Sequence, residues 1–219
     1  MTDTWSGAVV YAPSKTKMLW VIGQWMVPNP YPGLGDGTWY ASSWIGIDGD
    51  GGSNDVFQAG VQCEAIVSGG ITTRNIYAWW EWYPDDEVMI PNFPIFAGDG
   101  LHCVLCAESD TTGSVFLYNV SAGVYTSFKV TAGIKAGVQT TLVGNCAEWI
   151  VERPLVNKVA ANLADYGFVS FDVATAQVNH GPTLVAGSGN NINMTDARNN
   201  IISRGTNVND NVKCTYVRR

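Results

Sequence analysis

Apolar and polar residues alternate along many short segments of this 219-residue chain, and this alternation limits its fold more than any other feature. A period of two residues is that of a half-buried β-strand, because successive side chains point to opposite faces. Clusters of Gly, Pro, Asn and Asp separate the segments. Many short strands at this spacing predict an all-β fold, an antiparallel sandwich. The predicted strands cover residues 7–12, 20–27, 43–48, 56–66, 75–83, 102–107, 115–120, 124–130, 147–152, 168–173 and 212–218.

Helices and further domains find little support in the sequence. A helical pattern occurs only near residues 157–163, so we expect at most one short helix there. Charged residues make up 14% of the chain, whereas helical proteins carry more Lys, Glu and Arg on their solvent faces. Hydrophobic residues make up 46%, enough for one sizeable core, and we find no internal repeat and no linker. We therefore expect residues 1–219 to form a single domain.

The charge balance excludes several classes of partner. Twelve basic residues stand against nineteen acidic ones, for a net charge of −7, and the only basic cluster is Arg218-Arg219. Nucleic acid and membrane are therefore poor candidates, and no apolar run approaches the roughly 20 residues of a spanning helix. The first residues lack the basic and apolar regions of a signal peptide. We expect either a cytoplasmic protein or a mature chain without its leader.

The five cysteines do not form a metal-binding pattern. Cys103 and Cys106 are three residues apart with no second Cys/His pair at zinc spacing. On a strand, positions three apart point to opposite faces, so we expect no metal site there. The sequence does not decide whether the five cysteines form one or two disulfides or none.

Alternation also places large aromatic residues beside carboxylates and carboxamides. Solvent exposure explains each polar face separately, but solvated faces favour Lys, Thr and Glu over aromatic residues. The alternative is a concave, aromatic-lined groove with acidic groups. Such a groove would bind a sugar chain or an extended peptide, or hold a pair of carboxyl-type groups for acid–base chemistry. The sets on shared faces are Gln58, Gly60, Gln62 and Glu64; Tyr77, Trp79, Glu81 and Tyr83; Glu148, Ile150 and Glu152; and Trp44 with Asp48.

Several strings, read in order, resemble the glutamic peptidases, or eqolisins (peptidase family G1). The most specific are Trp82-Tyr83-Pro84 and Glu148-Trp149-Ile150-Val151-Glu152. The full set covers residues 5–9, 44–50, 57–61, 78–84, 98–100 and 147–152. The resemblance implies a sandwich of two large, about seven-stranded antiparallel sheets with a concave substrate cleft. It also implies a secreted, monomeric endopeptidase that cleaves polypeptides at acid pH, is insensitive to pepstatin and needs no metal or other cofactor.

The resemblance also implies roles for particular residues. The catalytic Gln corresponds to Gln58, and the catalytic Glu to Glu152, the second Glu of its string rather than the first. Residues that support or line the cleft correspond to Trp5, Trp44, Asp48, Trp79 and Glu81. The chain departs from the fungal pattern at Gln62, where an Asp is usual, at Arg153-Pro154, and in a longer segment between Gln58 and Glu81. These departures affect the expected cleft shape and specificity, whereas both members of the catalytic pair are present.

The chemistry of the pair agrees with this assignment. Hydrolysis of an amide without a metal or a Ser/Cys nucleophile needs a base for water and a donor for the developing oxyanion. A Glu with an ordinary pKa near 4.3 is partly ionised around pH 4, and Gln donates at any pH. Few basic residues also mean few salt bridges to lose in acid, so we expect acid tolerance. A carbohydrate-binding or glycoside-cleaving sandwich and an inactive peptide-binding relative remain alternatives.

Overall fold

The computed structural model describes residues 2–53 and 55–218 and is built almost entirely of β-strands. A single 3-10 turn, η1 (Ala186–Ser188), is the only helical element of the described residues. The strands are β1 (Trp5–Tyr11), β2 (Met18–Met26), β3 (Gly37–Asp48), β4 (Val56–Ser68), β5 (Ile71–Tyr83), β6 (Val88–Met89), β7 (Gly100–Ala107), β8 (Thr112–Asn119), β9 (Val124–Thr131), β10 (Ile134–Lys135), β11 (Val138–Gln139), β12 (Cys146–Glu152), β13 (Leu155–Val156), β14 (Val159–Ala160), β15 (Asn162–Leu163), β16 (Phe168–Val178), β17 (Thr183–Val185), β18 (Asn190–Thr195), β19 (Ile201–Val208) and β20 (Asn211–Tyr216).

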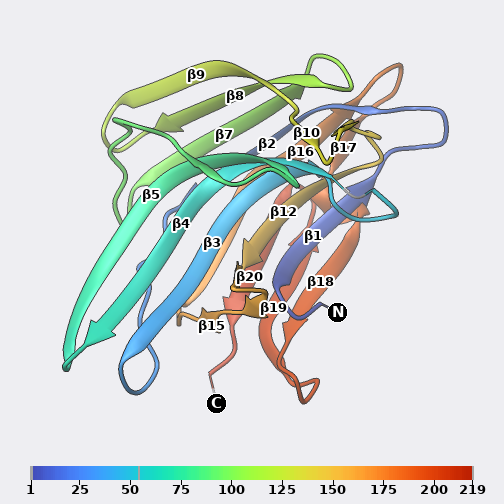
Figure 1. Ribbon diagram of the computed structural model, residues 1–219. Helices are drawn as coiled ribbons and strands as arrows, with labels where there is room; N and C mark the ends of the chain where they lie inside the picture. The colour runs from blue at the N-terminus through green and yellow to red at the C-terminus, as the bar shows by residue number, and fades with distance from the viewer. Residues whose placement is uncertain (1, 54, 219) are drawn as a thin grey trace.

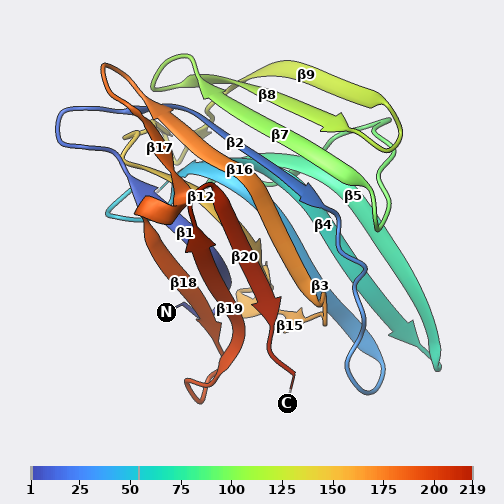
Figure 2. The same ribbon diagram turned by 180° about the vertical axis from the view of Figure 1, so that it is seen from behind.

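The large strands form two layers that face each other, which confirms the predicted antiparallel sandwich. Hydrogen bonds connect them in one path, β6-β5-β4-β3-β12-β1-β18-β19-β20-β16-β2-β7-β8-β9. Figure 1 shows the first half of this path as the front layer, and Figure 2 shows the second half from behind. The hydrogen-bonded path continues from one layer to the other through β18 and β19, which pair with each other. The two layers are therefore halves of one folded sheet.

The core lies between the layers and confirms the predicted strand faces. On β4, the predicted apolar set is completely buried: Phe57, Ala59, Val61, Cys63 and Ala65. Buried residues of the opposite layer, such as Val21 on β2 and Leu105 on β7, belong to the same cluster. The other face of β4 is thereby left for Gln58, Gln62 and Glu64, as alternation requires.

The predicted helix near residues 157–163 is wrong. This segment forms β14, which pairs with β13, and β15, which runs parallel to β3. Asn157 and Lys158 have φ values of 52° and 66° and make the tight turn of the β13–β14 hairpin. Two successive residues with positive φ cannot belong to an α-helix, so the apparent helical spacing reflects a hairpin.

The cysteines face the directions that the strand spacing predicts, and they form no disulfide. Cys103 is completely buried, whereas Cys106 lies half-exposed on the other face of β7, as the three-residue spacing predicts. Among the described residues no His, Cys, Asp and Glu cluster could hold a metal ion. All five cysteines are free, so the disulfides left open by the sequence are not formed. Cys103 and Cys106 share β7, whereas Cys63, Cys146 and Cys214 lie on β4, β12 and β20.

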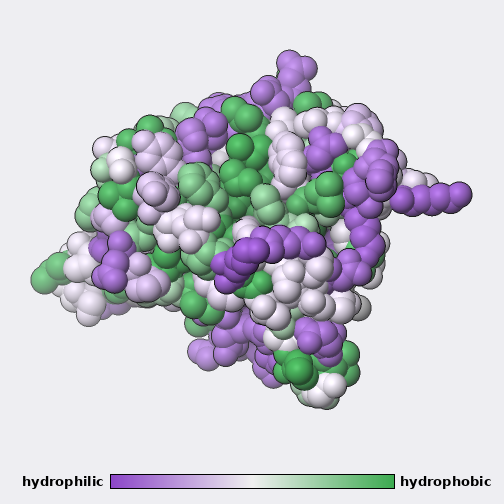
Figure 3. All heavy atoms as spheres, turned by 90° about the horizontal axis from the view of Figure 1, so that it is seen from above, coloured by the Kyte–Doolittle hydropathy of each residue, from purple (hydrophilic) through white to green (hydrophobic). Residues whose placement is uncertain are grey.

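The surface carries few ion pairs. Those of the described residues are Lys17–Asp110, Lys129–Glu108 and Arg218–Asp165, all at the surface. Seen from above, the molecule shows hydrophobic patches among hydrophilic side chains rather than a continuous charged face (Figure 3). In the described part of the chain, no helix is long and apolar enough to cross a membrane. Exposed ion pairs contribute about 0–1 kcal/mol each, so their loss in acid removes little stability.

Candidate active site

Strand register brings polar residues of five strands to one face of the front layer. The strands lie side by side in the order β1-β12-β3-β4-β5. Glu152 at the end of β12 pairs with Trp5 on one side and with Ser42 on the other. Farther along the layer, Gln58 of β4 pairs with Glu81 of β5. Paired residues on adjacent strands point to the same face of a sheet, and so do residues an even number apart on one strand. The side chains of Glu152, Gln58 and Glu81 therefore share the face that points away from the core.

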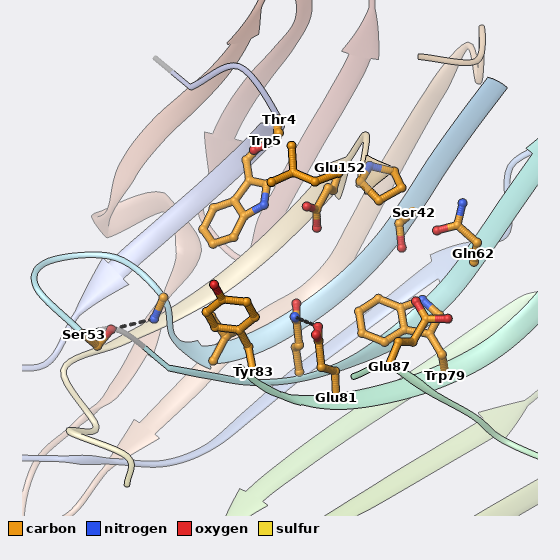
Figure 4. Close-up of a pocket in the computed structure, with 15 residues that line it drawn as sticks. Thr4, Trp5, Ser42, Ser53, Gln62, Trp79, Glu81, Tyr83, Glu87 and Glu152 are labelled. Carbon is orange, nitrogen blue, oxygen red and sulfur yellow. Dashed lines mark hydrogen bonds between the residues drawn. The ribbon is translucent and has the colours of Figure 1, made fainter. Parts of the chain in front are cut away.

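This face is hollowed into a cavity of about 650 Å³. Figure 4 shows Glu152 and Glu81 facing each other across it, with Ser53 at one end and Gln62 at the other. The described residues that line the cavity include no Lys and no Arg. Its lining is Thr4, Trp5, Ser42, Gly49, Ser53, Val56, Gln58, Gln62, Trp79, Glu81, Tyr83, Glu87, Glu152, Pro154 and Leu155. The cavity combines apolar walls with a few convergent polar groups, which is typical of a binding site.

Two tryptophans hold the Glu152 carboxyl group in place. Nε1 of Trp44 donates a hydrogen bond of 2.9 Å to Oε2 of Glu152. Trp5 packs edge-on against Trp44, with 5.1 Å between ring centroids. Burial raises the pKa of Glu152 to about 7, although hydrogen bonds from Trp5 and Trp44 lower it, and the charge of Glu81 raises it further. Glu152 therefore binds a proton more tightly than an exposed Glu does.

Across the cavity, Gln58 and Glu81 are joined by a short hydrogen bond. Nε2 of Gln58 donates to Oε2 of Glu81. Oε1 of Gln58 is buried without a hydrogen-bond partner among the described residues. Burial raises the pKa of Glu81 to about 7; the bond from Gln58 lowers it, and Glu87 and Asp86 raise it. Carboxyl groups that share a cavity without a cation hold protons more tightly, because ionising one disfavours ionising the next.

The structure brings five of the seven predicted site residues to the cavity wall, namely Trp5, Gln58, Trp79, Glu81 and Glu152. Trp44 is completely buried beneath the cavity and reaches it through its bond to Glu152. Asp48 is also completely buried and is not part of the wall.

Asp48 instead holds a loop. Its carboxylate accepts hydrogen bonds from the backbone N–H groups of Val143, Gly144 and Asn145, at 2.6, 2.9 and 2.7 Å. These bonds tie residues 143–145 to the end of β3. Asp48 therefore has a structural role next to the cavity and is not part of its wall.

Burial separates the two Glu residues of β12. Glu148 shares a face with Glu152, but it is completely buried and does not line the cavity. Burial and the charge of Asp50 raise the pKa of Glu148 well above its ordinary value. Alternation alone gives the two residues the same face and cannot distinguish them.

Sequence reasoning missed Glu87 and the β13 end of the cavity, formed by Pro154 and Leu155. Glu87 follows Pro84 in an acidic loop, and its pKa is raised mainly by burial. An acidic run directly after a cleft-lining strand was the available signal. The direction of the Glu87 side chain could not be predicted, because loop residues do not alternate between two faces as strand residues do.

Comparison with known proteins identifies the family of this chain and supports its fold. The profile of the Peptidase A4 family matches residues 3–216. Aspergillopepsin-2 of Aspergillus niger is 29% identical over 99% of this chain and 78% of its own length. Scytalidopepsin B of Scytalidium lignicola is 28% identical over 80% of this chain and 65% of its own length.

Solved structures share the fold. Scytalido-glutamic peptidase with a transition state analog inhibitor superimposes with a TM-score of 0.82, at 22% identity and 98% coverage of both chains. The aspergilloglutamic peptidase from Aspergillus niger gives a TM-score of 0.71 at 28% identity, covering 82% of this chain and 99% of that one. With the profile match over almost the whole sequence, these similarities show that the chain belongs to the Peptidase A4 family, the glutamic peptidases or eqolisins.

Proposed function

We propose that the chain is an endopeptidase active on the acidic side of neutrality, in which Glu152 activates water and Gln58 stabilises the oxyanion. The observation that carries this proposal is a single cavity lined by Glu152 and, across from it, by the Gln58–Glu81 pair. A scytalido-glutamic peptidase structure contains a peptide-based transition state analog. Polypeptide substrates, a single domain, a monomeric state and a location outside the cell are parts of the same proposal.

Glu152 serves first as base and then as acid. Its ionised form is stabilised by the Trp44 N–H, and its pKa of about 7 makes that form a stronger base than an ordinary carboxylate. It takes a proton from water while the water oxygen bonds to the scissile carbonyl carbon. When the C–N bond breaks, Glu152 returns that proton to the leaving nitrogen. The raised pKa moves the acid limb of activity above the range near pH 4 expected for an ordinary Glu.

Gln58 supplies the donor for the oxyanion when Glu81 carries a proton. Protonated Glu81 donates through its O–H to Oε1 of Gln58, the amide oxygen that otherwise lacks a partner. A half-turn of the amide about its last bond allows this contact and directs Nε2 towards the cavity. Glu81 is protonated below its pKa of about 7. The active form therefore combines ionised Glu152 with protonated Glu81, and Glu81 is a positioning residue.

Cleavage assays on denatured protein test the proposal directly. Between pH 5 and pH 7 we expect the chain to cleave protein, with or without pepstatin, and to leave a panel of polysaccharides intact. Replacing Gln58 by Ala should lower kcat by about 100- to 1,000-fold, because an oxyanion donor is removed. Gln24→Ala, on the outer face of β2, is the matched control and should retain full activity. Polysaccharide cleavage, or near-native proteolysis by Gln58→Ala, would refute the assignment.

The pH profile tests the role of Glu81. In the wild type, kcat/KM should fall as the pH rises above about 7, where Glu81 loses the proton that it donates to Gln58. Glu81→Gln keeps a hydrogen-bond donor at every pH. The fall of kcat/KM at high pH should therefore occur at least about one pH unit higher in this variant. Glu81→Ala removes the donor and should lower kcat at all pH values. An unchanged pH profile in Glu81→Gln would exclude this role.

A further inference from the structure

A second cavity, of about 400 Å³, lies next to the first. The two share Ser53, which stands at one end of the first cavity in Figure 4. The second cavity is lined by Gly52, Ser53, Asp55, Pro84, Lys135, Val138, Gln139, Thr140, Thr141 and Val143. It therefore continues the cleft beyond Ser53.

Hydrogen bonds hold the loop that forms most of the second cavity. The backbone N–H of Ala132 donates to the carbonyl of Thr111 at 2.9 Å, and that of Leu142 donates to the carbonyl of Asp110 at 2.8 Å. Asp48 holds the following residues from Val143 onwards. Both ends of the 132–143 loop are thus attached to the sandwich, so the cavity is already formed without a bound molecule.

The polar groups of this cavity favour an anionic guest. Nζ of Lys135 donates a hydrogen bond of 2.7 Å to the carbonyl of Pro84, which leaves two of its three N–H groups for a ligand. Lys135 is in none of the ion pairs formed by the described residues. Burial raises the pKa of Asp55 to about 7, so this carboxyl is neutral in acid and does not cancel the charge of Lys135. Ser53, Thr140 and Thr141 add hydroxyl groups.

The position of the cavity fits the path of an extended substrate. Ser53 and Gln62 mark the two ends of the cleft in Figure 4, so the cleft runs along β4 and β5. Gln58 and Asp55 are three residues apart, which is about 10 Å along an extended chain. A substrate bound as an extended strand spans that distance in about three residues.

We propose that the second cavity is a distal subsite that binds an acidic side chain, Asp or Glu, about three residues from the scissile bond, with Lys135 as the residue that recognises it. This proposal rests on the proposed peptidase function and adds a specificity to it. Lys135 acts only in binding, so its effect should appear in kcat/KM through KM and not in kcat.

Matched fluorogenic peptides test this subsite. One series carries Glu, Gln or Lys three residues before the scissile bond, a second series carries them three residues after it, and a short peptide lacks both positions. At pH 5, where a substrate Glu is mostly ionised, wild type should prefer Glu over Lys by about fivefold or more in one series, the ratio that corresponds to about 1 kcal/mol. Lys135→Met should bring this ratio close to one. Lys129→Met, an exposed change on the remote edge strand β9, should keep it.

The outcomes separate the subsite from the peptidase assignment. If wild type cleaves none of these peptides, the proposed function is wrong. If the short peptide is cleaved and neither series distinguishes Glu from Lys, or if Lys135→Met keeps the preference, the subsite proposal is overturned. Cleavage of the short peptide by Lys135→Met at the wild-type kcat shows that the variant is folded.

Discussion

Glu152→Gln is expected to lower kcat by about 1,000-fold or more while the protein stays folded. The substitution keeps the size of the side chain and an oxygen that accepts the 2.9 Å hydrogen bond from Trp44. It removes the only group in the proposed mechanism that can take a proton from water. Loss of a positioned general base typically costs about 100- to 10,000-fold. Steady-state kinetics at several pH values measure the loss, because no pH restores a base to a Gln side chain.

Two comparisons make the Glu152 result decisive. Glu108→Gln, at the exposed β7–β8 turn, should leave kcat unchanged. Glu152→Gln should still unfold at a temperature close to that of wild type, because the Trp44 hydrogen bond remains. A folded Glu152→Gln protein with near-native kcat would show that another group is the base. The buried Glu148 would then be the next residue to test.

The unfolding free energy is expected to be highest in acid and to fall as the pH rises from about 4 to 7. Carboxyl groups with a raised pKa in the folded state stay protonated there after they have ionised in the unfolded chain. Below the unfolded pKa, near 4.3, both states are protonated and the full stability is present. Above it, each such group costs about 1.4 kcal/mol per pH unit until its folded-state pKa is reached. The carboxyl groups with raised pKa that are not exposed to solvent are Asp48, Asp55, Glu81, Glu148 and Glu152.

Glu148→Gln tests this prediction at the most deeply buried of these groups. Glu148 is completely inaccessible, and its Oε2 has no hydrogen-bond partner among the described residues. Gln cannot ionise, so the variant should lose less stability between pH 4 and pH 7 than wild type does. Denaturant unfolding at pH 3.5, 5 and 7 measures the slope. Glu108→Gln is the control of opposite sign, because hydrogen bonds from Lys129 and Ser114 lower the pKa of Glu108.

If the unfolding free energy falls equally with pH in wild type and in Glu148→Gln, ionisation of Glu148 does not contribute to the loss of stability and the prediction is wrong. A wild-type melting temperature that collapses between pH 6 and pH 3 would contradict both this prediction and the acid tolerance expected from the scarcity of basic residues. The small number of ion pairs and the buried carboxyl groups limit the loss of stability in acid for separate reasons. Acid breaks the few exposed ion pairs at little cost, whereas burial destabilises the carboxyl groups only when they ionise.

Much of the fold was predictable because strand alternation is a local property. The buried face of β4, the core positions Ile45 and Ile47, and the opposite orientations of Cys103 and Cys106 all follow from a period of two. The segment at residues 157–163 was misread because two residues with positive φ make a hairpin that keeps helix-like apolar spacing. The free state of the cysteines was not predictable, since it depends on distances between strands.

Most residues of the site were predictable from the sequence, but which of them line the cavity and which are buried beneath it was not. Sequence motifs and alternation indicated Gln58, Glu81 and Glu152, and all three line one cavity. They also selected Asp48, which is buried and holds the 143–145 loop instead. Glu87 was missed because it lies in the loop between β5 and β6, where alternation does not indicate the direction of a side chain.

Sequence alone was enough to predict most of the long strands, their apolar faces, the resemblance to a peptidase family and the types of residue available for catalysis. These follow from periodicity and from short strings, which need no knowledge of distant contacts. Which acidic groups are buried, which face each other across the cavity and which lie beneath it depends on contacts that form only in the folded protein. Glu148 and Glu152 share a strand and a face, yet one is completely enclosed and the other lines the cleft. Burial and proximity set the pKa of each carboxyl group, and both arise from contacts between residues far apart in the chain.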